Sequence, residues 1–416
     1  MNQRIETVIV GGGQAGLATS YYLTALGREH VILERAPHTG SAWRDDRWDS
    51  FTLLTPNWSF RLPGAEYRGQ DPDGFLTRQE VIAHLEQYVK EYHLPVHHRA
   101  TVRSVEPAGN GTGYVVRTDG GTWLARHVVI ATGFFQHPRV PALSADLPAG
   151  IIQVPSGQYR NPDALPPGAV LVVGSAQSGC QIAEELYESG RKVYLCVGRA
   201  GRVPRRYRGR DTFEWLELVG FLDRTVDTLP TPRAKFGGSL QVSGRDGGRT
   251  LNLHQFARDG VTLLGHLEGA RDGVIRLASD LRENLAQADE TEAQITRLID
   301  GYIAQNGLDA PPDELVPLRD AYAAPEIASL DVGAAGVSSI IWAMGYTFDY
   351  SLVRLPVVDA DGYPVQTRGV TAYPGLYFVG MPWLHKFKSG LLIGVGEDAE
   401  YIASRIAAGD ALQTGV

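Results

Sequence analysis

The stretch Val8-Ile9-Val10-Gly11-Gly12-Gly13-Gln14-Ala15-Gly16 decides the fold of this chain. The run from Thr7 to Val10 predicts a buried parallel strand, because it is β-branched and too short for a helix. The glycines allow a tight turn, a close approach of the backbone to a pyrophosphate and close packing of helix on strand. The predicted helix through residues 17–23 ends at Gly27, and its first N–H groups would meet the phosphates. The stretch therefore predicts a dinucleotide-binding unit.

The residues after this turn complete the unit. A second predicted strand, His30 to Leu33, ends at Glu34, whose carboxylate can accept hydrogen bonds from an adenosine ribose. The order of strand, turn, helix, strand and acid is typical of a dinucleotide site; the alternative is a structural turn. Because an acid would repel a 2′-phosphate, the expected dinucleotide is FAD. We expect FAD contacts from this unit at Gly11, Gly13, Gln14, Ala15, Gly16, Glu34 and Arg35.

A second turn of the same kind, Gly174-Ser175-Ala176-Gln177-Ser178-Gly179, follows the apolar run 170–173 and precedes a predicted helix over 180–189. Ala176 replaces the middle glycine and adds a methyl group where the backbone would approach a pyrophosphate. The next predicted strand, 192–197, leads into a segment with five arginines and no acid. A guanidinium binds a 2′-phosphate with a bidentate fork, whereas an acid would repel it. The unit therefore predicts NADPH binding; the alternative is a solvated basic loop. The expected contacts are Gly174, Ser175, Gln177, Ser178, Gly179, Arg199, Arg205 and Arg206.

Length and composition limit the remaining possibilities. The 416 residues suit two domains, and the formal net charge of -8 argues against nucleic-acid binding. No apolar run approaches membrane-spanning length and no signal peptide precedes the first strand, so we expect a cytoplasmic protein without nucleic-acid or membrane partners. Cys180 and Cys196 are the two cysteines, so the Cys-x-x-Cys of a flavin disulfide reductase is absent. We expect no bound metal.

The segments around the second turn predict a split domain. A helix is expected over 75–93, a β-meander over 101–105 and 113–118, and a strand over 126–130 that runs into Ala131-Thr132-Gly133. A downstream strand over 338–342 runs into a similar segment, Ala343-Met344-Gly345, and we expect the chain to pass between domains at both places. The predicted fold class is α/β with two Rossmann-like dinucleotide-binding domains. The FAD-binding domain, 1–160 and 331–416, is expected to be split around an inserted NADPH-binding domain, 161–330. An amphipathic helix over 279–306 is expected to serve packing.

Several further segments carry a resemblance. They are Leu53-Leu54-Thr55-Pro56-Asn57 before Phe60, Gly40-Ser41-Ala42-Trp43-Arg44, the two Ala-x-Gly segments and the tail 375–380. With the paired turns, they resemble the class B flavoprotein monooxygenases, and within that class the bacterial flavin-containing monooxygenases with their YUCCA-like branch. The identifying motif of the family has a His before a Ser and a Tyr-Arg pair. In this chain the matching residues are Ser156 and Tyr159-Arg160, and Pro155 stands at the position of the His. The role of that His in coupling flavin and nicotinamide is therefore not carried over.

The resemblance implies additional site residues. Asn57 matches the active-site Asn of the family, whose amide donates to the peroxide or to substrate; the other interpretation is a turn residue after Pro56. The last helix is expected to open at Lys388, with its N-terminus and the charges of Lys386 and Lys388 near the flavin N1–C2=O edge, although both lysines could instead be exposed. The remaining implied cofactor contacts are Trp43, Arg44, Val102, Ala131, Thr132, Gly133, Gly345, Gly380, Ser389, Gly390, Leu391 and Leu392.

The chemistry that the resemblance implies is NADPH-dependent monooxygenation. NADPH gives a hydride to flavin N5, the reduced flavin takes up O2 at C4a, and the hydroperoxide passes one oxygen to a small nucleophilic substrate with an N, S or carbonyl centre. Three alternatives remain open: an NADPH oxidase or flavin reductase that releases peroxide, a Baeyer-Villiger monooxygenase, and a non-catalytic nucleotide-binding sensor. The expected partners are a small-molecule substrate and O2, and a homodimer is one open possibility for the assembly.

Overall fold

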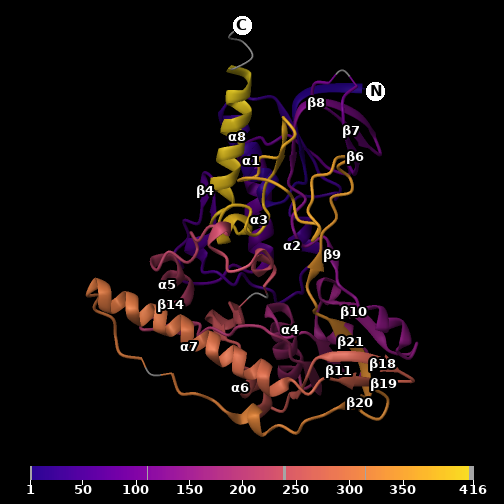
Figure 1. Ribbon diagram of the computed structural model, residues 1–416, viewed down its shortest axis with the longest axis vertical. Helices are drawn as coiled ribbons and strands as arrows, with labels where there is room; N and C mark the ends of the chain where they lie inside the picture. The colour runs from indigo at the N-terminus through magenta and orange to yellow at the C-terminus, as the bar shows by residue number, and fades with distance from the viewer. Residues whose placement is uncertain (1, 110, 238–239, 314, 412–416) are drawn as a thin grey trace.

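The computed structural model describes residues 2–109, 111–237, 240–313 and 315–411. Two α/β bodies lie one above the other, and the end of helix α8 (Val395–Ala411) lies at the top of the upper body (Figure 1). No helix within the described residues is long and apolar enough to cross a membrane. The predicted class, α/β with two Rossmann-like units, is confirmed.

The upper body is built on a seven-stranded sheet. Its central strands run parallel, with Val10 opposite both Leu33 and Ile130. Strands β6 (Val102–Pro107) and β7 (Tyr114–Thr118) form the predicted meander, and β7 also pairs antiparallel with the first half of β8 (Gly121–Ile130), which was not predicted. In spatial order the strands are β5 (Val96–His97), β2 (His30–Leu33), β1 (Asn2–Val10), β8 (Gly121–Ile130), β7 (Tyr114–Thr118) and β6 (Val102–Pro107), with β23 (Leu376–Phe378) also paired to β8.

The helices of the upper body cover this sheet. The first turn of α3 (Arg78–Glu91) is fixed by a capping box between Thr77 and Glu80, and the helix buries Val81 and Leu85 in the core. Apolar residues of α1 (Gln14–Ala25) and α8 (Val395–Ala411) pack in the same core, and the two helices lie side by side in Figure 1. The helices are α1 (Gln14–Ala25), α2 (Ser41–Asp45), α3 (Arg78–Glu91) and α8 (Val395–Ala411).

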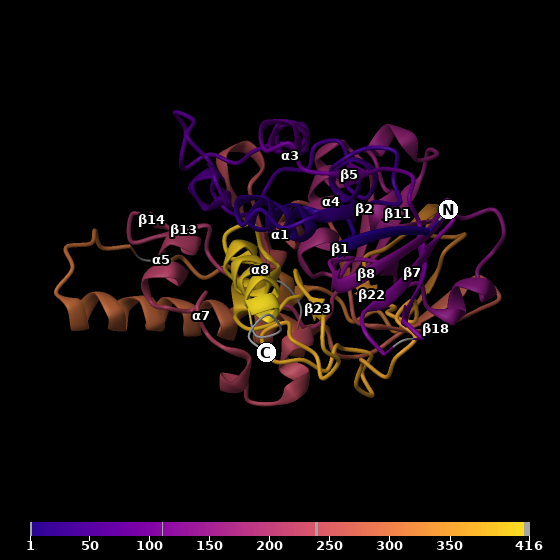
Figure 2. The same cartoon turned by 90° about the horizontal axis from the view of Figure 1, so that it is seen from above.

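The lower body is built on a five-stranded sheet in which every pair is parallel. Its strands in spatial order are β10 (Ile152–Pro155), β21 (Val337–Trp342), β11 (Ala169–Val173), β12 (Val193–Cys196) and β17 (Thr262–Leu264). Its helices are α4 (Gln177–Glu188), α5 (Thr212–Leu218), α6 (Leu253–Arg258) and α7 (Leu281–Asn306). The long helix α7 projects to the left when the molecule is seen from above (Figure 2). Its buried side belongs to two apolar clusters, one shared with α6 and the other shared with α5.

Short antiparallel strands form small additional sheets beside the two main sheets. A three-stranded sheet contains β18 (Leu267–Arg271), β19 (Val274–Leu277) and β20 (Ser329–Asp331). Two-stranded pairs are formed by β3 (Arg61–Leu62) with β4 (Ala65–Glu66), β13 (Arg206–Tyr207) with β14 (Arg210–Asp211), and β15 (Val242–Ser243) with β16 (Arg249–Thr250).

The chain passes between the bodies at a short antiparallel pair, β9 (His137–Pro138) with β22 (Tyr346–Thr347). Each strand follows one Ala-x-Gly segment, as expected. The domain boundaries need correction, however, because β10 and β21 lie outside 161–330 yet pair in the lower sheet. Ile340 and Ile341 in β21 are fully buried, as a central parallel strand requires. The inserted domain therefore runs from about the end of β9 to about the start of β22.

The start of the last helix also differs from the expectation. Residues Phe387–Gly390 form a short 3₁₀ turn, η9, and α8 begins only at Val395. The Ser389 hydroxyl accepts hydrogen bonds from the backbone N–H groups of His385 and Lys386, at 3.2 and 3.0 Å. These bonds close η9 as a separate turn, so Lys388 does not open α8.

Candidate functional site

The two glycine turns are structurally equivalent. The Gly11 N–H donates to the Leu33 carbonyl at 3.0 Å, and the Gly174 N–H donates to the Cys196 carbonyl at 3.1 Å. Gly11 and Gly174 have φ of 108° and 105°, which only glycine adopts without strain. Each turn thus leaves its strand in the same direction and begins a helix at the carboxyl edge of its sheet. This edge is where ligands bind in open α/β folds.

Close backbone packing explains two glycines of each turn. A Cβ on Gly11 would lie 2.6 Å from the Ala131 carbonyl oxygen, and one on Gly174 would lie 2.5 Å from that of Ala343. A Cβ on Gly16 or Gly179 would collide with the carbonyl oxygen of the glycine that opens the turn. The first Ala-x-Gly segment, with Thr132 and Gly133, therefore lies against the first turn, and the second segment lies against the second turn.

The middle position of the turn is different. A Cβ on Gly13 would meet nothing within 4 Å. Ala176 has φ -69° and ψ -176°, close to the φ -80° and ψ -175° of Gly13. The backbone therefore accepts alanine here without a change of conformation. The methyl group of Ala176 reduces the space through which a pyrophosphate would approach the turn.

The helices that follow the two turns have no side-chain cap. The residues at their N-caps, Gly13 for α1 and Ala176 for α4, offer no hydrogen bond to the first turn. By contrast, Thr77, Asp211 and Asn252 cap α3, α5 and α6. Uncapped N–H groups at a helix N-terminus favour an anion. Both turns therefore fit the pyrophosphate of a dinucleotide.

Glu34 lies beside the first turn. Its carboxylate accepts hydrogen bonds from the backbone N–H groups of Gly12 at 2.6 Å and Ala36 at 2.8 Å, and the side chain is buried. Arg35 is exposed. The Glu34 carbonyl accepts from the Ala100 N–H at 2.9 Å, which places Val102 of β6 near this end of the sheet.

The C-terminal part of the chain returns to the first turn. The Gln14 side chain donates to the Gly390 carbonyl at 2.8 Å. Gly380, with φ of 85°, lies so close to Ala15 that a Cβ would collide with the alanine methyl. The predicted FAD contacts from residues 11–16, 131–133, 380 and 389–390 are therefore brought together around one turn.

Trp43 and Arg44 belong to α2. Arg44 pairs with Glu86 at 2.6 Å. The Arg47 guanidinium lies over the rings of Trp43, Phe51 and Phe135, with centroid distances of 5.6, 5.4 and 5.5 Å. No local sequence signal distinguishes Arg47 from other arginines, so sequence reasoning missed it.

Asn57 is buried at the start of η1 (Asn57–Ser59). Its Nδ2 donates to the Asp71 carbonyl at 2.9 Å, and its Oδ1 accepts from the Leu76 N–H at 2.6 Å. The side chain thus holds the segment 71–76 against η1. The Asn57 amide therefore has a structural role, and the same amide would have to serve the catalytic role that the resemblance implies.

The charges of Lys386 and Lys388 are neutralised. Lys386 lies 2.7 Å from Asp223 and 2.8 Å from Glu397, and Lys388 lies 3.0 and 2.5 Å from the same two carboxylates. Although burial raises the pKa of Glu397, hydrogen bonds from the two lysines hold it below its usual value. Asp223 belongs to the inserted domain, so the network ties η9 to that domain. Beyond η9, Leu391 packs beside the inserted domain, whereas Leu392 lies in the core with α1.

The second turn is held by polar contacts of the lower body. The Ser175 hydroxyl accepts from the Gly198 N–H at 2.9 Å, just beyond the end of β12. The Gln177 side chain donates to the Val242 carbonyl at 3.1 Å, and Ser178 is half-buried in the first turn of α4. The Gly345 carbonyl accepts from the Arg139 N–H at 2.9 Å, beside the crossing.

The three predicted phosphate-binding arginines do not gather at one place. Arg199 is exposed and pairs with the exposed Glu283 at 2.9 Å, so it is accessible to a ligand. Arg206 is exposed and donates to the Gly247 carbonyl at 3.0 Å.

Arg205 lies in a structural contact instead. It is buried, pairs with Asp211 and donates to the Leu54 carbonyl at 2.7 Å. Its guanidinium also lies 4.8 Å from the Phe75 ring centroid. These contacts join the two bodies and correct the expectation that Arg205 is available for a 2′-phosphate.

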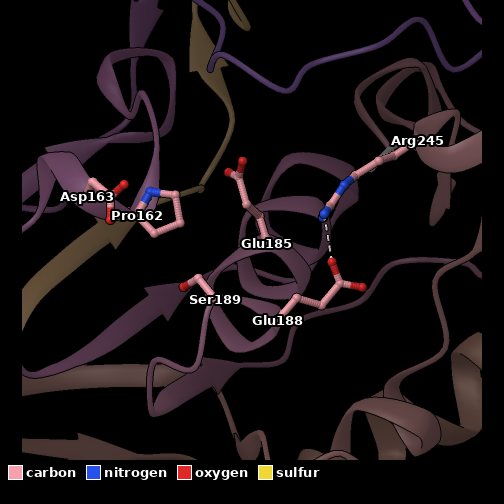
Figure 3. Close-up of a pocket in the computed structure, with 6 residues that line it drawn as sticks. All are labelled: Pro162, Asp163, Glu185, Glu188, Ser189 and Arg245. Carbon is pink, nitrogen blue, oxygen red and sulfur yellow. Dashed lines mark ion pairs between the residues drawn. The ribbon is translucent and has the colours of Figure 1, made fainter.

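The family motif at Tyr159-Arg160 forms another junction. The hydroxyls of Tyr159 and Ser50 both donate to the Glu185 carboxylate of α4, at 2.8 and 2.7 Å. Figure 3 shows the hollow beside it, about 320 Å³ in volume, where Arg245 pairs with Glu188 at 2.8 Å. Sequence reasoning gave no role to Glu185, because its partners are distant in the chain.

Cys180 and Cys196 are free and buried on separate elements. Burial raises the pKa of the Cys196 thiol to about 12, so it stays protonated at neutral pH. Within the described ranges, no group of three or more His, Cys, Asp or Glu side chains is placed to hold a metal ion.

Comparison with known proteins agrees with this geometry. A family model described as pyridine nucleotide-disulphide oxidoreductase matches residues 8–210. The chain is 31% identical to an uncharacterized CzcO-like oxidoreductase of Geobacillus kaustophilus, over 98% of this chain and 99% of the relative. It is 30% identical to the indole-3-pyruvate monooxygenase YUCCA1 of Oryza sativa subsp. japonica, over 70% of this chain and 75% of that protein.

A solved structure extends the similarity to the whole fold. The flavin-containing monooxygenase from Stenotrophomonas maltophilia superposes with a TM-score of 0.67, over 98% of this chain and 99% of that chain, at 22% identity. At that identity the match supports the arrangement of the two bodies.

Proposed function

Because this chain belongs to the class B flavoprotein monooxygenases, we propose that it is a cytoplasmic, NADPH-dependent FAD monooxygenase acting on a small nucleophilic substrate. In this proposal the upper turn holds FAD and the lower turn holds NADPH. Bound FAD supplies the chemistry by accepting a hydride and reacting with O2, and one oxygen atom passes to an N, S or carbonyl centre.

The observation that carries the proposal is the pair of equivalent, uncapped helix N-termini. Both α1 and α4 begin at a glycine turn on the carboxyl edge of a parallel sheet. The two units differ after the second strand of each, where a free ribose would be distinguished from a 2′-phosphorylated one. Glu34 stands there in the first unit, and Gly198-Arg199 stand there in the second. An acid suits a free ribose 2′-hydroxyl, whereas a guanidinium suits a 2′-phosphate.

The test uses the purified protein. We expect bound FAD, rapid anaerobic reduction by NADPH and slower reduction by NADH at equal concentration. A panel of amines, sulfides, thiols and ketones is then scored by substrate-stimulated NADPH oxidation and product mass. Lack of FAD, or equal use of the two nicotinamides, would contradict the proposed assignment of the turns.

A second candidate is an NADPH oxidase that releases peroxide. It is favoured by one observation: the Asn57 amide, expected to serve the oxygenated flavin or the substrate, is hydrogen-bonded at both ends to the segment 71–76. The peroxide formed per NADPH in the presence of each substrate separates the two activities.

A further inference from the structure

His266 lies beside the segment that follows β12, where the second turn would place the adenosine ribose. Strands β12 and β17 are parallel neighbours, with Cys196 opposite Leu264. Their carboxyl ends therefore meet at one edge, and this brings His266 next to Gly198, the residue before Arg199. A Cβ on Gly198 would lie 3.2 Å from the His266 Nε2, nearer than from any other atom of that ring. Glycine at 198 thus leaves room for the imidazole, whose Nε2 faces this edge.

Asp280 fixes the orientation of the ring. One carboxylate oxygen accepts from the His266 backbone N–H at 3.0 Å, and the other contacts the ring Nδ1. Although burial raises the pKa of Asp280, its hydrogen bonds with His266 hold that pKa below its usual value. Since Nδ1–H is directed to Asp280, a neutral ring presents a lone pair at Nε2, and a protonated ring presents an N–H donor there.

The other groups that face His266 are compatible with anion binding. The Asn284 side chain lies 3.3 Å from the ring Nδ1, on the same side as Asp280. Arg199 follows Gly198 in the segment after β12 and pairs with Glu283 of α7, with side-chain exposures of 73% and 67%. Such an exposed pair contributes roughly 1 kcal/mol or less, so a phosphate can displace Glu283. The His266 side chain is itself 49% exposed.

We propose that His266 is a second recognition group for the adenosine 2′-phosphate of NADPH, acting beside Arg199. The inference rests on the proposed function, because it assigns NADPH to the lower turn. The protonated imidazole donates from Nε2 to a phosphate oxygen, while Asp280 balances its charge. NADPH affinity therefore depends on the His266 side chain, and NADH affinity does not.

The test uses the FAD-loaded, oxidised enzyme with two probes, 2′,5′-ADP and 5′-AMP, whose dissociation constants are measured by calorimetry at about pH 6. His266→Gln removes the Nε2 cation of the protonated ring, and His266→Lys keeps a cation. His93→Asn, at an exposed position in the upper body, is the control.

We expect His266→Gln to bind 2′,5′-ADP about tenfold more weakly than the wild type, with 5′-AMP unchanged. His266→Lys should retain the affinity, which a merely structural histidine would not allow. Equal binding of 2′,5′-ADP by the wild type and His266→Gln would overturn the inference. If NADPH does not reduce the wild-type flavin at all, the proposed function has failed instead.

Discussion

The Glu34 carboxylate accepts a hydrogen bond from the backbone N–H of Gly12, with 2.6 Å between the oxygen and the nitrogen. The same carboxylate also accepts from the Ala36 N–H at 2.8 Å. Glu34 therefore shapes the first turn through the protein backbone, in addition to any contact with a ribose. The acid that indicates FAD in the sequence is also part of the structure that receives FAD.

Replacing Glu34 tests this double role. Glu34→Ala leaves two backbone N–H groups without partners, so we expect the free energy of unfolding to fall by about 1–3 kcal/mol and FAD to be lost during purification. Glu34→Gln keeps an acceptor and should retain more of both. Denaturant titrations and the FAD content of the purified variants give the answer; full FAD occupancy in Glu34→Ala would count against the role.

The middle residues of the two turns allow a matched exchange. Gly13→Ala should fold with unchanged stability, because its Cβ meets nothing within 4 Å, yet bind FAD more weakly because the methyl faces the pyrophosphate. Ala176→Gly should conversely bind NADPH more tightly. Gly11→Ala is the control for strain, since its φ of 108° and the Ala131 carbonyl at 2.6 Å predict misfolding. Unchanged affinities in both exchanges would place the phosphates elsewhere.

Asn57→Ala separates support of the fold from support of the reaction. Loss of the contacts to Asp71 and Leu76 should lower the unfolding free energy by about 1–3 kcal/mol. If Asn57 also serves the reaction, peroxide release per NADPH should increase as well. Asn57→Asp keeps the acceptor for Leu76 and loses the donor to Asp71. A destabilised Asn57→Ala enzyme with unchanged coupling would leave only the structural role.

His127 makes the fold sensitive to acid. Neither ring nitrogen has a hydrogen-bond partner among the described residues, and burial lowers the pKa of His127 from 6.5 to about 4. Below about pH 6.5 the unfolded chain takes up a proton that the folded protein refuses until about pH 4, so stability falls as the pH falls through this window. The full effect is on the order of 3 kcal/mol.

Urea titrations across that window check the expectation. His127→Leu, which is similar in size and does not titrate, should lose much of the acid dependence, whereas the exposed control His93→Asn should keep it. Parallel pH profiles for the wild type and His127→Leu would show that other groups cause the acid sensitivity.

Local patterns predicted the two dinucleotide units well. The strand His30–Leu33 has the predicted bounds, and the strand before the first turn ends at Val10 as expected. These segments are specified by their own apolar runs and glycines, so short-range physics decides them. The long helix α7, expected over 279–306, occupies Leu281–Asn306 for the same reason.

Long-range contacts explain what the sequence could not predict. Strand β10 belongs to the lower sheet only because β21, far downstream, pairs with it. The sequence predicts Arg205 as an exposed cation, yet its ion pair with Asp211 and its hydrogen bond to the Leu54 carbonyl hold it in a buried position. His266 becomes a candidate ligand only when the ends of β12 and β17 meet. In each case the deciding partner lies in another element, which local patterns do not encode.

The central claim is that the enzyme transfers an oxygen atom from O2 to a substrate with electrons from NADPH. The most direct measurement is turnover under ¹⁸O₂ with a nucleophilic substrate that stimulates NADPH oxidation, followed by product mass and peroxide yield. The account predicts one ¹⁸O atom in the product, nearly one product per NADPH and little peroxide. Stoichiometric peroxide with no labelled product across the panel would contradict it and identify an oxidase.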